Sequence, residues 1–244
     1  MFLAFCHDYD EAAHWACAEL RAEGLALELI TERQLERACR WEYRLGAGGV
    51  GLVVELDDGR VLRQEGVRGV LNRLIAVPSM LVGRAETADR DYAEAELGAF
   101  YLSWLAGLPN AINPATPQGI GGAWRHISEW AVLAARAGLA VPVYRQSDRD
   151  PPEQGYGGLA PPGTAIRTVI VLRDALYGAE VPDEIGAACR SLAAASTTDL
   201  LGIDLFEAED GGLRFSHAGP WPDLRQGGEP LIQGLRRALG GEAA

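Results

Sequence analysis

Residues 1–31, MFLAFCHDYDEAAHWACAELRAEGLALELIT, contain the pattern that decides the fold. The apolar run at residues 2–6 predicts a first strand. The helical spacing of small and apolar residues over 11–23 predicts a helix that ends before Gly24. A second apolar run follows at residues 25–30. Strand, helix and strand in this order form the β-α-β unit with which an α/β domain opens.

Turn signals and helical spacing continue along the next part of the chain. Asp57-Asp58-Gly59 separates two strand-like runs and predicts a hairpin over residues 48–64. The further elements expected here are a strand at 69–74 and helices at 87–105 and 122–137. We therefore expect residues 1–147 to form an N-terminal domain.

A linker and a second, smaller domain are expected beyond residue 147. Residues 148–163 contain four prolines and four glycines and show no hydrophobic period, so they are expected to be a linker. The elements expected after it are strands at 166–172, 175–179, 200–207 and 213–216 and helices at 182–195 and 230–239. Residues 164–244 are therefore expected to form an α+β domain.

The charge of the chain limits its partners. The net charge is 22 − 34 = −12, and such a surface repels phosphate backbones and anionic lipids. We expect neither a nucleic-acid nor a membrane partner. The apolar start is too short for a signal peptide, and no run approaches the ~18 apolar residues that span a bilayer. Four widely spaced cysteines without a CxxC pair favour reduced thiols, so a cytoplasmic location is expected.

All 22 basic residues are arginine, and the sequence contains no lysine. A Schiff-base lysine, a phosphate-loop lysine and a lysine general base are therefore excluded. A GC-rich genome would also favour arginine over lysine without any functional reason.

Three segments, taken together, carry a family resemblance. They are 110–142, which begins Asn-Ala-Ile-Asn-Pro, 165–171, and 201–224. In order and spacing they resemble motifs of the ATP-grasp superfamily, in the branch of peptide- and amino-acid-ligating enzymes with a pre-ATP-grasp domain. The resemblance implies an α/β protein with a pre-ATP-grasp-like βαβ domain first and a truncated ATP-grasp-like α+β subdomain after it.

The resemblance also implies a set of candidate ligand-binding residues. Arg125 falls near a lysine position of the family, and Arg167 lies on the strand whose arginine faces the phosphates. Asp204 matches the first acidic metal ligand. These three side chains are the expected anion-binding floor, and no catalytic residue is assigned.

Departures from the family pattern are as informative as the matches. Between Val143 and Arg167 there is no room for the four-stranded lid that clamps the nucleotide. The later metal-ligand positions hold His217 (or Ser216) and Gly219, and one carboxylate is insufficient to hold catalytic Mg²⁺. No cofactor is therefore expected, except Mg·ATP if the protein is an active ligase. His217 with Asp204 is a candidate site for a softer metal, and the alternative is that His217 is a structural, hydrogen-bonded histidine.

Two further sets of residues have a functional and a structural interpretation. His7, at the end of the first strand, could polarise a substrate, or it could pack locally while Asp8 or Asp10 caps the next helix. Arg68 and Arg73 flank a strand in a region that the related ligases use for the acceptor peptide. They could bind a carboxylate, or they could make surface ion pairs.

The expected function is that of a non-catalytic ATP-grasp-like protein that binds a peptide, a small carboxylate or a ligase partner. The alternative is an ATP-dependent carboxylate–amine ligase with a reduced nucleotide site. A third interpretation places a transition metal at Asp204 and His217, beside His7. A homodimer is expected. Trp104 and Trp130 are expected to be core residues or interface anchors, and in the second case the helix surfaces that carry them would suit dimerisation.

Overall fold

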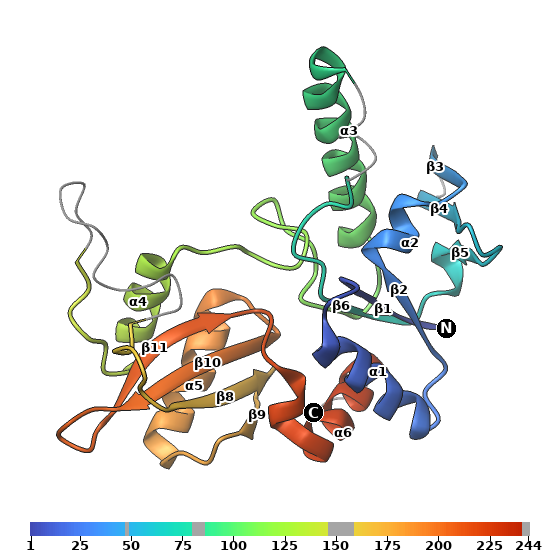
Figure 1. Cartoon of the computed structure of the whole chain (residues 1–244). Helices are drawn as coiled ribbons and strands as arrows, with labels where there is room; N and C mark the ends of the chain where they lie inside the picture. Colours follow the sequence, from blue (N-terminus) through green and yellow to red (C-terminus); the bar gives the residue numbers. More distant parts are fainter. Residues whose placement is uncertain (47–48, 80–85, 146–158, 241–244) are drawn as a thin grey trace. The chain divides into compact units, whose positions relative to one another are not determined.

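The computed structural model describes residues 1–46, 49–79, 86–145 and 159–240 (Figure 1). The chain divides into two compact units. The first consists of Met1–Ala123 with Arg236–Ala243, and the second of Trp124–Leu235. Residues 148–158 of the expected linker lie outside the described residues, and the domain boundaries at 147 and 164 stay predictions.

A parallel sheet organises the first unit. Its strand order is β2-β1-β6-β7, with bounds Leu27–Thr31, Phe2–Cys6, Gly69–Asn72 and Ala111–Ile112. Helix α1, Glu11–Ala22, connects β1 to β2, so the predicted β-α-β opening is confirmed. The Asp10 carboxylate accepts from the Ala13 N–H and caps α1, and Gly24 ends this segment with a φ of 84°.

A second, antiparallel sheet of the same unit contains β3, Arg40–Gly46, β4, Gly49–Glu55, and β5, Val61–Arg63. The predicted hairpin is confirmed as β4 and β5, with Gly59 at a φ of 84° in the turn. Strand β3 was not predicted, although the alternation of Trp41, Tyr43 and Leu45 is the strand signal that would have found it. Before β3 lies the short helix α2, Glu32–Glu36, with a capping box.

Helix α3, Thr87–Ala106, joins this core through its carboxyl-terminal half. The Trp104 ring lies 5.3 Å from the Phe5 ring, and Tyr101 lies 5.3 Å from Trp41, both edge to face. Trp104 is 2% exposed, as is Trp130 of the second unit. Of the two roles expected for these tryptophans, the core role is confirmed and the dimer-surface role is wrong, because each fills the core of its own unit. The homodimer stays a prediction.

The second unit is built on an antiparallel sheet with the order β11-β10-β8-β9. The strands are Leu213–Gly219, Leu200–Glu207, Ile166–Leu172 and Ala175–Gly178. Helices α4, Ile127–Arg136, and α5, Asp183–Ser196, contribute to the hydrophobic core on one face (Figure 1). The strands expected here from the sequence are confirmed.

The other face of this sheet receives the 3-10 helix η3, Leu224–Gly227, and the start of α6, Gly228–Gly240. A Cβ at Gly234 would lie 2.2 Å from the Tyr177 Oη, so only glycine allows this close approach. Helix α4 begins at Ile127 rather than at residue 122, because Gly122 has a φ of 104° and the His126 ring accepts from the Ser128 N–H as a cap.

The cysteines are free thiols, of which only Cys39 is exposed. Burial raises the pKa of Cys6 and Cys17 to about 12 and that of Cys189 to about 11. Within the described ranges, no helix is long and apolar enough to cross a bilayer.

Candidate functional site

Thr168, Asp204 and His217 lie side by side across three strands of the second unit, and we call them the Asp204 row. Asp204 of β10 pairs in register with Thr168 of β8 and with His217 of β11. Their neighbours Val169, Ile203 and Ala218 belong to the core under α4 and α5. Because side chains alternate along a strand, the row faces away from those helices.

A bulge shapes β11 beside the row. The register of β10 and β11 shifts between Asp204 and Leu205, which leaves Ser216 as the extra residue. The Ser216 Oγ accepts from the Ala160 N–H at 3.2 Å, and its carbonyl accepts from the Leu159 N–H at 2.9 Å. These two hydrogen bonds hold Leu159 and Ala160, which precede β8 in the chain, against the edge strand β11.

Hydrogen bonding and burial decide the charges of the Asp204 row. The Thr168 hydroxyl donates to Asp204 Oδ1 at 2.7 Å. Burial lowers the pKa of His217 below its usual value of 6.5, and the nearby Asp204 opposes this only in part. The imidazole is therefore neutral at pH 7, and the row carries one negative charge from Asp204.

The row does not match the donor set that Mg²⁺ prefers. One carboxylate and one neutral imidazole are its ionisable groups, whereas Mg²⁺ is held by carboxylate and phosphate oxygens. In the part of the chain that the structure describes, no three His, Cys, Asp or Glu side chains gather into a metal-binding group. A softer metal at Asp204 and His217 stays a prediction.

Arg167 does not join Asp204 on the same face of the sheet. It pairs in register with Leu205, the residue after Asp204, and side chains alternate. Its guanidinium is exposed and lies 3.3 Å from the Glu207 carboxylate. The structure thus gives this expected anion-binding residue a surface ion pair.

Arg125 has a structural contact that the sequence did not indicate. Its Nη2 donates to the Ser196 carbonyl at 3.1 Å. This carbonyl lies at the carboxyl end of α5, where the helix dipole stabilises a positive charge. The guanidinium also lies 5.7 Å from the centre of the Trp130 ring. The Arg125 Nε is buried and has no hydrogen-bond partner among the described residues. This buried N–H is therefore an unsatisfied donor beside the end of α5.

Three of the predicted residues of the first unit lie where β1 and β6 end, and we call these three, His7, Asp10 and Arg73, the Arg73 cluster. The chain leaves β1 toward β2 on one side and returns to β6 on the other, so this is the switch point of the parallel sheet. Arg73 is 3% exposed, and its Nε and Nη2 atoms donate to the two oxygens of Asp10 at 2.7 and 3.1 Å. Asp10 thus binds Arg73 and caps α1 with the same carboxylate.

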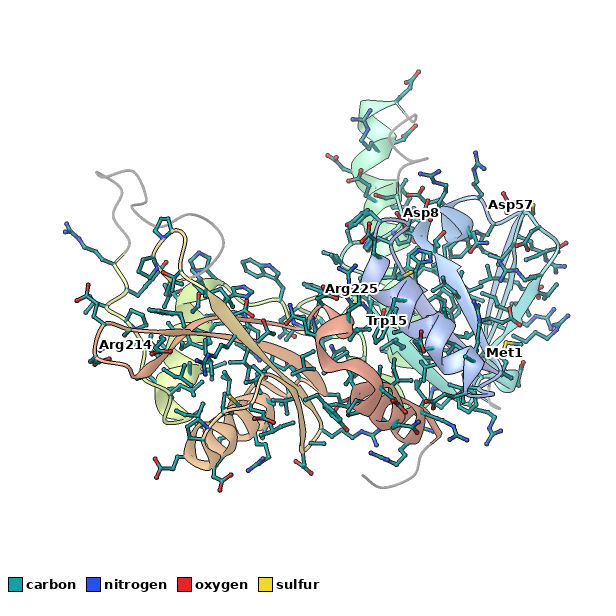
Figure 2. The ribbon with its side chains drawn as sticks, turned by 60° about the horizontal axis from the view of Figure 1, so that its bottom comes forward. Met1, Asp8, Trp15, Asp57, Arg214 and Arg225 are labelled. Carbon is teal, nitrogen blue, oxygen red and sulfur yellow. The ribbon has the colours of Figure 1, made fainter. Side chains whose placement is uncertain are left out.

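His7 is also held by neighbouring groups. Its Nε2 accepts from the Ile75 N–H at 2.9 Å, and its Nδ1 lies 3.5 Å from a Glu32 oxygen. The exposed Tyr9 ring stacks on the imidazole with centroids 5.1 Å apart. Asp8, in the turn after β1 (Figure 2), pairs with Arg33 at 2.8 Å. A ligand role for His7 stays a prediction.

The two arginines that flank β6 differ in their surroundings. Arg73 is buried, so the expectation of a surface ion pair is wrong for it. Arg68 is exposed, and its guanidinium lies 5.1 Å from the centre of the Phe2 ring. Of the pair, Arg68 alone offers a solvent-accessible charge.

Sequence reasoning missed Thr168 as a member of the Asp204 row. The sequence shows that Thr168 shares one face of a strand with Ile166 and Ile170, because these residues are two apart. It does not show which strand pairs with this one or in which register. Between Val143 and Ile166, none of the described residues lies in a helix or strand, and residues 146–158 lie outside the description. The missing lid therefore stays a prediction.

Comparisons with known proteins agree on the fold. No protein-family model matches the chain, and no curated protein matches it in sequence. Among solved structures, it is similar to macrocyclase MdnC from Microcystis aeruginosa MRC bound with precursor peptide MdnA. The TM-score is 0.72 at 12% identity, over 99% of both chains.

Two other solved structures support the same assignment. The Chryseobacterium gregarium RiPP-associated ATP-grasp ligase, in complex with ADP and a leader and core peptide, matches with a TM-score of 0.73 at 10% identity, over 100% of this chain and 97% of that one. ATP-grasp ligase PsnB, complexed with minimal precursor, Mg and ADP, matches with a TM-score of 0.66 at 15% identity, over 98% of both. The chain therefore has the mixed α/β, ATP-grasp-like fold that its sequence motifs predicted.

Proposed function

We propose that this protein binds a peptide on an ATP-grasp-like scaffold without transferring a phosphoryl group. The Asp204 row is the observation that carries the proposal. At the metal-ligand positions stand Asp204, whose carboxylate accepts from Thr168, and His217, whose imidazole is neutral. Phosphoryl transfer depends on cations that neutralise the developing charge, and this row offers one carboxylate to hold them.

The composition supports the same proposal. The sequence contains no lysine, so no lysine stands at the positions that neutralise the phosphates in the ligases it resembles. Arg125 keeps the charge of one such position but donates to the end of α5, and Arg167 pairs with Glu207. Both arginines are thus engaged within the protein.

A peptide is the ligand class that the structural comparisons favour. The similar structures of MdnC, of the Chryseobacterium ligase and of PsnB were each obtained with a precursor or a leader and core peptide. Backbone and side-chain contacts along an extended ligand need no nucleotide. A small carboxylate and a ligase partner are the other ligands of this proposal.

The test separates nucleotide binding from peptide binding. Isothermal titration calorimetry with Mg·ATP should give no binding heat at micromolar concentrations, and a dissociation constant in that range would contradict the proposal. Random peptides displayed on phage should yield binders, which fluorescence anisotropy then measures on the purified protein. Failure to select any peptide would remove the peptide part.

The second candidate function is an ATP-dependent carboxylate–amine ligase. It is favoured by the similar structures that hold ADP, one of them with Mg. In that case Mg·ATP would be bound with the help of Arg125, Arg167 and Asp204. Release of ADP that depends on an amine acceptor, and that is lost in Asp204→Asn but kept in the exposed control Glu209→Gln, would establish it.

Self-association and a cytoplasmic location also belong to this proposal. Since Trp104 and Trp130 are buried, a homodimer would need another surface. Sedimentation velocity over a range of protein concentrations tests for it directly.

A further inference from the structure

The chain that leaves β6 is held by hydrogen bonds from its backbone, and the last of them goes to a histidine. Strands β1 and β6 are parallel neighbours, and directly after β6 the Arg73 N–H donates to the Phe5 carbonyl at 2.8 Å (Figure 1). Two residues later, the Ile75 N–H donates to the His7 Nε2 at 2.9 Å. Among the described residues, none forms a hydrogen bond with residues 76–79. His7 is therefore the final hydrogen-bond anchor of this segment.

Only a neutral imidazole can accept the hydrogen bond from Ile75. Since the Nε2 of His7 is the acceptor, the proton of the neutral ring lies on Nδ1. In the imidazolium form both ring nitrogens carry hydrogens, so the Nε2–H would point at the Ile75 N–H and the two donors would repel each other. Ile75 is 48% exposed, so its N–H, once displaced, can donate to water instead.

The imidazolium form has a partner of its own at the opposite ring nitrogen. A Glu32 oxygen lies 3.5 Å from Nδ1, which is longer than a normal N–H···O hydrogen bond, so it adds little to the neutral ring. A positive ring would be attracted to this carboxylate, whose side chain is only 16% exposed. The other Glu32 oxygen accepts from the Asp8 N–H at 2.7 Å, which fixes the carboxylate in place. Each form of His7 thus has its own partner, Ile75 for the neutral ring and Glu32 for the charged ring.

The other charged groups around this imidazole are paired with one another. Asp8 pairs with Arg33 at 2.8 Å. Asp10, whose N–H donates to the backbone carbonyl of the histidine, binds Arg73 through both carboxylate oxygens. Burial raises the pKa of the neighbouring Cys6 thiol to about 12, so this thiol stays neutral. The carboxylate that faces Nδ1 is therefore the group that a positive ring would meet.

We propose that His7 is a pH-sensitive switch that holds or releases residues 75–79. In its neutral form the ring accepts from Ile75 and holds this segment at the carboxyl ends of β1 and β6. When the ring takes up a proton, it releases Ile75 and pairs with Glu32. Open α/β sheets bind ligands at this edge, so the state of the ring controls access to it. The switch is independent of whether the protein binds a peptide.

The test measures the exchange of single backbone amides by NMR on the isotope-labelled full chain, between about pH 8 and about pH 5. Each rate is divided by that of an unstructured peptide at the same pH, which removes the pH dependence of the exchange chemistry. Protection of the Ile75 amide should fall at least about tenfold on acidification, whereas that of the Arg73 amide, which donates to a carbonyl, should change by less than about twofold. Equal falls at both amides would overturn the proposal, because they would indicate a general loss of structure.

Two variants separate the ring from its surroundings. His7→Gln keeps an acceptor, the amide oxygen, but cannot take up a proton, so Ile75 protection should vary by less than about twofold over the same range. Glu32→Gln removes the partner of the charged ring, so release should require a lower pH than in the unchanged protein. His14→Gln, at an exposed position of α1, is the matched control and should leave the Ile75 response as it is. A fall in His7→Gln as large as that in the unchanged protein would show that another group acts, and the proposal would be wrong.

A second measurement needs no variant. The nitrogen chemical shifts of the imidazole report its protonation directly, so the titration of the His7 ring and the loss of Ile75 protection should share one midpoint. A ring that titrates while the Ile75 amide stays protected would contradict the switch. A ring that stays neutral down to about pH 5 would contradict it as well.

Discussion

The Arg73 cluster and the Asp204 row are both sets of polar side chains at positions where a ligand was expected, yet they differ in how their charges are satisfied. Arg73 is buried, and two of its nitrogens donate to Asp10. Asp204 is only half-buried and accepts from the neutral Thr168 hydroxyl. A buried, bidentate ion pair that also caps a helix indicates a structural role, whereas a half-buried carboxylate keeps capacity for a ligand.

The largest effect should come from breaking the pair in the Arg73 cluster. Arg73→Ala leaves the Asp10 carboxylate in a site with a side-chain exposure of 14% and should cost about 3–5 kcal/mol of unfolding free energy. Urea denaturation measures this loss. Arg68→Ala, which removes an exposed arginine beside the same strand, is the control and should cost less than about 1 kcal/mol. Equal losses would show that burial does not distinguish the two arginines.

A smaller effect is expected in the Asp204 row. Thr168→Val keeps the shape of the side chain and removes the hydroxyl that donates to Asp204, which should cost about 1 kcal/mol. The same urea experiment measures it. A loss as large as that of Arg73→Ala would mean that the row is as structural as the cluster.

The pH dependence of stability sharpens the comparison further. The folded chain binds a proton at His217 less readily than the unfolded chain, because burial lowers the pKa below 6.5. As pH falls through 6.5 toward the folded pKa, the unfolded state takes up the proton first and stability decreases. Above pH 6.5 this contribution is fully present.

Removal of the imidazole tests that expectation. His217→Gln should show a shallower loss of unfolding free energy than the unchanged protein between about pH 7 and about pH 5. His14→Gln, at an exposed position of α1, controls for the loss of a histidine as such. Parallel curves for the unchanged protein and His217→Gln would contradict the lowered pKa.

The smallest effect is expected for Arg167. Its side chain is 51% exposed and its partner Glu207 is 58% exposed, so solvent screens the pair. Arg167→Ala should therefore change the unfolding free energy by no more than about 0.5 kcal/mol. A larger change would indicate a contact of Arg167 beyond its ion pair.

Local patterns predicted those elements whose signal lies within a few consecutive residues. The β1-α1-β2 opening, the turn at Gly59 and strands β8 to β11 follow from periodicity and turn residues. Strand β7 was missed because two residues in a proline-rich segment have no period, and only pairing with β6 makes them a strand. The start of α4 was missed because His126 is an uncommon cap.

By itself the sequence determined the mixed α/β class and the absence of lysine, since these depend on residue type and order alone. Only the tertiary structure decided which of the candidate residues meet. Strand register places Thr168 and His217 beside Asp204 and turns Arg167 to the other face, and the packing of the first unit buries Arg73 against Asp10. The physical reason is that register and burial arise from contacts between segments far apart in the chain, which no local pattern contains.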